Sequence, residues 1–503
     1  MRRLYIVGII AGLLVVLGLA GNGGFESPKS AEATQTTVTW MYPASGGAGI
    51  QAAPNTATTT SVLTTAACAN CYITSIVPDL VYQNDPDPIN HPNGASANFN
   101  NSSLANAWMH HMVVVDTCAP NYRIFSSGNE RSTVSLPAGY GYFEGNCGGW
   151  FINYHIHNSS NATRGVALKL VVTYRTGETL SPVTPIWLDM SNSGASEYTI
   201  PEGYSDIHTG SGASGIAPDY VSAVQGQLVA IGGHVHDYGI STSAFNNRLN
   251  DYICTSTSGY GAGSRYLPTG GAGTAGHPAA GNSLTLNQAY HESGGVPDDR
   301  YHIQQMTACA PTAAQSIICN GDVIRLHTQY NNGSGFPIFD AMGIILGYVA
   351  TNQPDTNSNG TIDACEDTDS DGVLNSADNC PFWVNANQVM PTWTIPAGDS
   401  DCDGFADSVA TGGRAAESFV GTVATQHCAA SAAANNEPLP DAWPVDFNDD
   451  QLVNVQDMLK LAPVFGSHSP TPPYTARFDL TGDGVISVPD ILKIAPFFGN
   501  RCA

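Results

Sequence analysis

The sequence predicts a mainly β protein with two tandem antiparallel jelly-roll or β-sandwich domains, followed by acidic loop repeats and a small α-helical module. The 503-residue chain contains 53 glycines and 31 prolines, a composition that suits turn-rich β structure. Short apolar runs such as "ALKLVVTY" and "AMGIILGYV" lie between clusters of Gly, Asn, Ser and Pro, as in antiparallel sandwiches. After Thr351 this pattern gives way to aspartate-rich loops.

The first 20 residues are typical of a secretory signal. Arg2 and Arg3 form a basic start, the apolar stretch runs from Leu4 to Leu19, and Ala20 ends a small-residue cleavage site. An uncleaved anchor is the alternative, and no later segment is apolar enough to span a membrane. We therefore expect a secreted, extracellular or cell-surface protein, in which the twelve cysteines can form disulfides. Proximity in the chain suggests the pairs Cys118–Cys147 and Cys309–Cys319.

The formal charge of −25 is concentrated near the C-terminus. Residues 355–503 contain 21 acidic and 5 basic residues, a balance of −16, and the preceding residues carry the remaining −9. This distribution argues for bound cations and against a nucleic-acid partner.

The strand-rich region is too long for one ordinary sandwich. Its turn-rich segment Thr176–Pro185 predicts a division into domains at 36–180 and 186–350.

Three aspartate-rich loops follow within residues 355–410. "DTNSNGTIDACE" matches the EF-hand calcium loop at every ligand position. Such a loop can bind calcium because oxygens on alternate residues around a tight glycine turn can surround one hard cation. "DTDSDGVLNSAD" and "DSDCDGFAD" repeat the pattern. The tandem resembles thrombospondin type 3 repeats. The expected calcium ligands are Asp355, Asn357, Asn359, Asp363 and Glu366, then Asp367, Asp369, Asp371, Asn375 and Asp378, then Asp399, Asp401, Asp403 and Asp407.

A second internal repeat occupies residues 441–503. "DFNDDQLVNVQDMLKLAPVFG" and "DLTGDGVISVPDILKIAPFFG" align without gaps, and each loop leads into a short apolar helix that Pro463 or Pro496 should end or kink. The pair is similar to dockerin type I modules, which implies a cohesin-like or cell-surface partner, although the "LAPxFG" endings depart from the better-known dockerin helices. The expected calcium ligands are Asp446, Asn448, Asp450, Asn454 and Asp457, then Asp479, Thr481, Asp483, Ser487 and Asp490.

The histidines are few but clustered. "WMHHMVVVD" contains His110 and His111, although adjacent strand residues normally point to opposite faces. "NYHIHN" and "GGHVHDYG" are H-x-H pairs, whose imidazoles share a face and can bind one metal ion. Spacing alone leaves His155 and His157 equivalent as ligands. Zinc also favours imidazole, whereas a thioether beside imidazoles points to copper.

The order "HHM", "YHIHN", "GHVH" and "GDVIRLHTQYNN…DAMGIILGYV" resembles the copper type II ascorbate-dependent monooxygenases. The resemblance covers about residues 60–350. It implies two copper centres, one formed by His110, His111 and His155 and the other by the catalytic ligands His234, His236 and Met342. In that case His157 does not bind copper itself but supports one of the residues that do.

The resemblance also implies a reaction. One copper ion collects electrons from ascorbate or another donor, and the other reacts with O2 to hydroxylate a C–H bond of a small organic substrate. Gly232, Ile344 and Leu346 stand where peptide-amidating members bind a peptide carboxylate, which argues against glycine-extended peptides. The family's nearby cysteine pair is replaced by His327 and Gly343. His327 is either a surface residue or a further ligand or proton carrier.

Two other functions fit the residues. A non-catalytic copper- and calcium-binding surface or adhesion protein would bind copper without oxygen uptake. A cupin-like iron or zinc site at "GGHVHDYG" would lack the usual downstream glutamate and leave Met342 unexplained.

Overall fold

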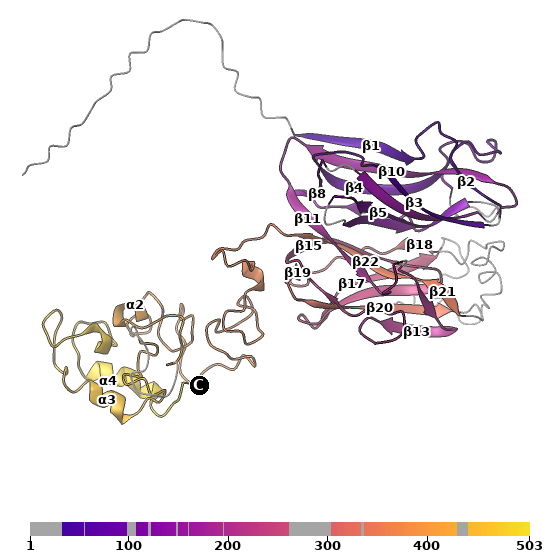
Figure 1. The fold of residues 1–503 in the computed structure, drawn as a ribbon. Coiled ribbons are helices and arrows are strands. Elements are labelled where there is room, and N and C mark those ends of the chain that lie inside the picture. Colours follow the sequence, from indigo (N-terminus) through magenta and orange to yellow (C-terminus); the bar gives the residue numbers. More distant parts are fainter. Residues whose placement is uncertain are drawn as a thin grey trace, which may run out of the picture.

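The computed structural model describes residues 33–54, 56–97, 107–118, 122–146, 149–158, 160–194, 196–260, 303–332, 337–429 and 441–502. The expected signal segment, residues 1–20, lies outside these ranges. Among the residues described, no helix is long and apolar enough to cross a membrane. The chain is mainly β, with two successive sandwiches followed by loops and short helices (Figure 1).

Alternation of apolar and polar residues builds the first sandwich. Leu168, Leu170 and Val172 of one sheet and Ile152 and Ile156 of the other are buried in one core. The first sheet contains β1 (Thr34–Tyr42), β10 (Arg164–Thr176), β4 (Cys71–Tyr82) and β8 (Tyr140–Glu144), with β2 (Ile50–Ala52) and β7 (Val134–Ser135) beside them. The second runs in the order β3 (Thr56–Thr65), β9 (Gly149–Asn158), β5 (Ala107–Asp116) and β6 (Arg123–Gly128).

The second sandwich begins with β11 (Ser181–Asp189), inside the segment where the sequence predicts a division. β11 pairs with β22 (Gly343–Ala350), followed by β15 (Gly226–Val235) and β19 (Ile317–Ile318). The facing sheet contains β13 (Gly203–His208), β20 (Val323–Asn332), β16 (Gly239–Asn246), β17 (Asp251–Tyr260) and β18 (Ile303–Met306), with β14 (Tyr220–Val221) on β20. β12 (Tyr198–Ile200) pairs with β21 (Ile338–Ala341).

The two sandwiches share a sheet and an apolar boundary. β11 pairs in parallel with β8, so one sheet continues from the first sandwich into the second. Leu346 and Tyr348 of β22 pack into the first core, and the Tyr348 hydroxyl donates to the Ile124 carbonyl at 2.7 Å. The Arg123 guanidinium lies 5.0 Å from the centre of the Trp187 ring. These contacts hold β6 against β11 and β22.

The C-terminal region has its own core, which contains Trp393, Phe405, Trp443 and Phe497. Phe405 belongs to the third acidic loop, so that loop packs together with the helical repeats. The helices are α2 (Glu417–Val420), α3 (Val455–Lys460) and α4 (Val488–Ile494), with 3-10 turns η2 (Asp363–Cys365), η3 (Ala476–Phe478) and η4 (Ala495–Phe497).

The expected pairing of Cys309 with Cys319 is wrong. Cys309 follows β18, which pairs with β17, so it bonds to Cys254 of β17, whereas Cys319 reaches forward to Cys365 in the first acidic loop. Cys118 is disulfide-bonded, and Cys147 lies outside the described residues. The other disulfides are Cys68–Cys71, Cys380–Cys402 and Cys428–Cys502.

Candidate metal centres

A β-bulge brings the adjacent histidines of β5 together. The register of β5 against β9 shifts between Met109 and His111, so His110 is the extra residue of the bulge. Both imidazoles are buried, and their Nδ1 atoms lie 3.3 Å apart. The bulge therefore removes the strand alternation that would have separated the two rings.

His155 and His157 approach this pair from β9. The ring centre of His155 lies 4.6 Å from that of His110, and the ring centre of His157 lies 4.9 Å from it. One nitrogen from each of these three residues falls within a sphere that could hold a metal ion. The structure thus leaves both His155 and His157 as partners of His110.

His234 and His236 stand at the end of β15 and are held by hydrogen bonds. His234 Nδ1 lies 3.0 Å from Glu130 Oε1, and His236 Nδ1 bonds to the Asp340 carbonyl. A carbonyl oxygen only accepts, so His236 must carry its proton on Nδ1. The Glu130 carboxylate favours the same tautomer for His234. Such contacts are typical of the groups that orient histidine ligands.

Met342 lies in the irregular step between β21 and β22. The Tyr330 hydroxyl accepts from the backbone N–H groups of His236 and Met342, each at 3.1 Å, and donates to the Met342 carbonyl. Tyr330 is fully buried. One side chain therefore fixes the backbone at two of the three expected ligands of the second centre.

The two expected copper centres form one continuous cluster. The ring centres of His110 and His236 are 4.0 Å apart, closer than the 5.1 Å between His234 and His236. His110, His111 and His236 also place ligand nitrogens within reach of one ion. This differs from the expectation of two distinct centres, because β5 and β15 approach each other directly at the boundary between the sandwiches.

The unsatisfied nitrogens of the cluster fit a metal. Nε2 of His155, His234 and His236 is buried without a hydrogen-bond partner, although buried polar atoms are normally paired. Burial lowers the pKa of His155 to about 4 and, with the neighbouring histidines, that of His111 to about 3. Neutral imidazoles with an unused lone pair are the form that binds transition metals.

Two cavities adjoin the cluster at His234. One, of about 360 Å³, is lined by His111, His234 and Met342 together with Arg123 and Glu197. The other, of about 320 Å³, is lined by Gly232, Ile344 and Leu346, and Glu130 is the charged carboxylate in its wall. No Lys or Arg is among the described residues of this second wall. The cavities are large enough for a small organic molecule.

His327 lies away from this cluster. It is on β20, partly exposed, with its Nδ1 3.7 Å from Asp206 Oδ1 and its ring beside His208. Glu130, Asp340 and Tyr330 were not predicted as site residues, because none forms a spacing pattern with the histidines.

All five acidic loops have the same backbone fold. The first aspartate of each accepts hydrogen bonds from backbone N–H groups four or five residues later, as Asp399 does from Asp403 and Gly404 at 3.2 and 2.8 Å. The fourth and sixth residues are left-handed in every loop. Asp367, Asp369 and Asp371 place oxygens within reach of one ion.

The later loop positions serve partly as hydrogen-bond acceptors within the loop. Asp363, Asn375 and Asp407 accept from the residue at the second position, at 2.8, 2.9 and 2.9 Å. Asn454 with Asp457 and Ser487 with Asp490 form capping boxes at the starts of α3 and α4. Their carboxylates also accept from Phe447 and Thr481 within the loops.

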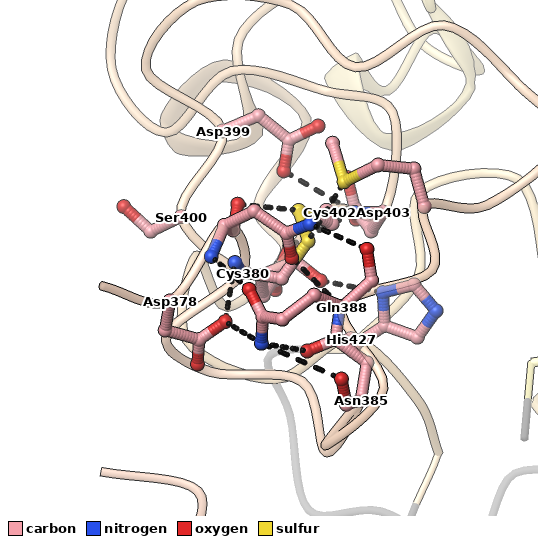
Figure 2. Close-up of a disulfide and its surroundings, with 12 residues drawn as sticks. Asp378, Cys380, Asn385, Gln388, Asp399, Ser400, Cys402, Asp403 and His427 are labelled. Atoms are coloured by element: carbon pink, nitrogen blue, oxygen red, sulfur yellow. Dashed lines mark hydrogen bonds between the residues drawn. A yellow bond between two sulfur atoms is a disulfide. The ribbon is translucent and has the colours of Figure 1, made fainter. Parts of the chain in front are cut away.

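The third loop is the most buried of the five. Asp401 and Asp403 are fully buried, and Figure 2 shows Asp399 and Asp403 beside the Cys380–Cys402 disulfide. Burial raises the pKa of Asp401 to about 6, and burial with repulsion from Asp401 raises that of Asp399 to about 8. Burial therefore makes it costly to ionise these neighbouring carboxylates together unless a cation compensates their charge.

α3 and α4 repeat an exposed apolar face. Val455, Leu459 and Phe465 in the first unit correspond to Val488, Leu492 and Phe498 in the second. Each of the six residues exposes between 49% and 63% of its surface. Large apolar residues exposed at matching positions are typical of interaction surfaces.

Comparison with known proteins identifies one segment of the chain. Residues 354–388 match the family described as thrombospondin type 3 repeat, so the chain contains a calcium-binding repeat of that family. No curated protein matches the chain.

Solved structures similar to the chain include peptide-N(4)-(N-acetyl-β-D-glucosaminyl) asparagine amidase, with 9% identity and a TM-score of 0.31 over 64% of this chain and 98% of that one. A structure of PNGase F from Flavobacterium meningosepticum has a TM-score of 0.30 at 9% identity, covering 63% of this chain and 97% of that chain. These values are too low to carry a functional argument.

Proposed function

We propose that the protein is an exported copper-dependent monooxygenase that hydroxylates a C–H bond of a small organic substrate, using O2 and a one-electron reductant such as ascorbate. The observation that carries the proposal is the set of buried, unpartnered Nε2 atoms of His155, His234 and His236 beside the cavity lined by Met342. Imidazoles with a thioether favour copper over harder metals. Copper bound there would supply one-electron redox chemistry and activate O2.

The resemblance assigns His110, His111 and His155 to one ion and His234, His236 and Met342 to the other. The protein's own contribution is orientation and exclusion of water. Glu130 and the Asp340 carbonyl keep Nε2 of the H-x-H pair available, and Tyr330 fixes the backbone that carries Met342. In the overall reaction one oxygen atom enters the C–H bond and the other leaves as water, with two electrons and two protons consumed.

The second cavity supports an uncharged substrate. Its wall combines apolar residues such as Ile344 and Leu346 with the hydroxyls of Ser132 and Thr133. Without a cationic side chain among the described lining residues, a substrate carboxylate would be desolvated without a partner. A neutral molecule of moderate size fits this environment better than a peptide acid.

The test compares purified full-length protein with Met342→Leu, which keeps the side-chain volume and removes the sulfur. We expect two copper ions per wild-type chain and ascorbate-dependent oxygen uptake. Met342→Leu should abolish the uptake while His110, His111 and His155 still bind copper. Met41→Leu, on β1, is the matched control and should behave as wild type. Unchanged turnover in Met342→Leu would refute the assignment.

The merging of the two histidine groups favours a second function. Because His110 lies as close to His236 as to its own group, the cluster could bind a single ion in a non-catalytic surface protein. One copper ion per chain with no ascorbate-dependent oxygen uptake would support that function.

We also infer that the five acidic loops bind calcium and that the repeated face on α3 and α4 binds a cohesin-like partner on a cell surface. The exposed face occurs twice with equivalent residues, so either copy should suffice. We expect Leu459→Ala and Leu492→Ala alone to retain binding to immobilised cohesin, and the double variant to lose it. If the double variant binds cohesin with wild-type affinity, this face is not the cohesin-binding surface.

A further inference from the structure

The third acidic loop lacks the residue that normally completes a calcium site. In loops of this type the twelfth residue supplies a carboxylate that binds the ion through both oxygens. The other four loops have an acid at that place, Glu366, Asp378, Asp457 and Asp490, whereas the loop that starts at Asp399 has Ala410.

The acid at the ninth position is bonded within the loop, as Asp363 and Asn375 are in the first two loops. Both carboxylate oxygens of Asp407 accept from Ser400, at 2.9 Å from its backbone N–H and 2.6 Å from its hydroxyl. The acids at the first, third and fifth positions are Asp399, Asp401 and Asp403, and Asp403 is fully buried with an Oδ2 atom that has no hydrogen-bond partner.

Glu417, the first residue of α2, is held directly against this loop. Its backbone N–H donates to the Ala406 carbonyl at 3.0 Å, and the next N–H, of Ser418, donates to the Asp407 carbonyl at 3.0 Å. Glu417 is fully buried. One carboxylate oxygen accepts from Thr422 at 3.2 Å, and the other, Oε2, has no hydrogen-bond partner.

The nearby cation does not pair with these acids. Arg414 donates to the carbonyls of Thr394 and Gly404, and its guanidinium lies 4.8 Å from the centre of the Phe497 ring. Among the described residues, no ion pair joins it to Glu417 or Asp403. Two buried carboxylates, Asp403 and Glu417, therefore have unused oxygens and are close enough for Glu417 to repel the charge of Asp403, an arrangement that is costly unless a cation neutralises them.

We propose that Glu417 replaces the missing twelfth ligand, so that Asp399, Asp401, Asp403 and Glu417 bind one calcium ion. This inference rests on the proposed calcium binding of the loops and adds a ligand from outside the repeat. Carboxylate oxygens without nitrogen or sulfur suit a hard cation, and the flexible coordination of calcium accepts a ligand from a separate helix.

The site lies at the centre of the C-terminal core. Trp393 donates to the Cys402 carbonyl at 3.0 Å, and Trp443 donates to the Asp403 carbonyl at 2.9 Å. Both rings belong to the core that also holds the helical repeats. An ion bound here would join the loop, α2 and that core, so it should be the calcium ion with the largest effect on the folding of this region.

The experiment compares full-length wild type with Glu417→Gln, which keeps the shape and the Thr422 hydrogen bond but removes the charge. Calcium titration by calorimetry should show one site weakened at least about tenfold, because affinity follows the number of charged ligands. In calcium-free buffer the order of stability should invert: Glu417→Gln should melt higher than wild type, since a buried charge has been removed. A purely structural role would lower the melting temperature in both conditions.

Glu202→Gln, an exposed acid on the second sandwich, is the control for loss of charge and should change neither measurement. Glu417→Asp keeps the charge but withdraws the carboxylate by one methylene, so it should weaken calcium binding even if Glu417→Gln fails to fold. If either variant binds calcium with the same affinity as the wild type, Glu417 is not a ligand, although the loops can still be calcium sites. If the wild type binds no calcium, the proposal that the loops are calcium sites is itself refuted.

Discussion

His234 has the contacts expected of a residue in the proposed metal site. Its Nδ1 is held by Glu130, its Nε2 is buried and unpartnered, and its ring borders both cavities. The pairing with a buried carboxylate fixes the orientation of the ring. Sequence spacing predicted that His234 could be a metal ligand, whereas Glu130 lies on a turn far away in the chain and could be placed beside it only from contacts.

A buried acid of the first sandwich should give a measurable pH dependence. Burial raises the pKa of Glu144 to about 7, from an ordinary value of 4.5, although Trp150 donates to its Oε2 at 3.0 Å. The folded state therefore binds the proton more tightly, and the stability contributed by the protonated acid is lost as the pH rises from about 4.5 through 7.

We expect Glu144→Gln to keep the Trp150 hydrogen bond and to raise the free energy of unfolding at pH 8 by roughly 2 kcal/mol. The gain should disappear near pH 4. Chemical denaturation at both pH values measures it, with exposed Glu202→Gln as the control. An equal effect at the two pH values would show that the charge of Glu144 is not responsible.

At the scale of elements, the bulge in β5 and the close approach of β6 decide the shape of the histidine cluster. Gly128 ends β6, and a Cβ placed there would lie 2.6 Å from the His110 carbonyl and 2.9 Å from His234 Cε1. A backbone carbonyl cannot move aside cheaply. The missing side chain of Gly128 therefore allows β6 to bring Glu130 to His234.

Gly128→Ala should push β5 and β15 apart. We expect a loss of about 1–3 kcal/mol in the free energy of unfolding, typical of overpacking, together with reduced copper content. Thermal unfolding and metal analysis of the purified protein test this. Gly194→Ala, where a Cβ meets no atom within 4 Å, is the control. Retention of wild-type stability by Gly128→Ala would contradict the close packing of these strands.

At the scale of the whole molecule, covalent and ionic links join otherwise separate units. The Cys319–Cys365 disulfide ties the first acidic loop to the second sandwich, and Gln225 donates to the Gly360 carbonyl at 2.6 Å. The later loops have the disulfides Cys380–Cys402 and Cys428–Cys502, and in the proposed calcium sites bound ions would neutralise their carboxylates. The sandwiches, in contrast, contain two large apolar cores.

Removal of calcium should therefore unfold the C-terminal region selectively. With EDTA, limited proteolysis should cut within residues 367–502 and leave a protected fragment containing both sandwiches. Added calcium should restore protection, because ions that bind only the folded loops stabilise them by mass action. Mass spectrometry of the fragments provides the measurement. Equal protection of residues 367–502 with and without calcium would contradict ionic stabilisation.

The sequence alone determined the features that depend on local spacing. Alternating apolar runs specified a mainly β fold, the turn-rich segment at residues 176–185 predicted a division between two domains, and the spacing of aspartates and glycines specified loops that fold alike. These patterns are readable because side-chain direction repeats every two residues in a strand and loop ligands are close in the chain.

Only the tertiary structure decided which distant groups meet. It joined the two histidine groups through His110 and His236, placed Glu130 on His234, paired Cys319 with Cys365 and set Glu417 against the loop of Asp403. Each of these contacts depends on how sheets and loops pack, and packing is set by the shapes of buried surfaces. No local pattern in the chain encodes it.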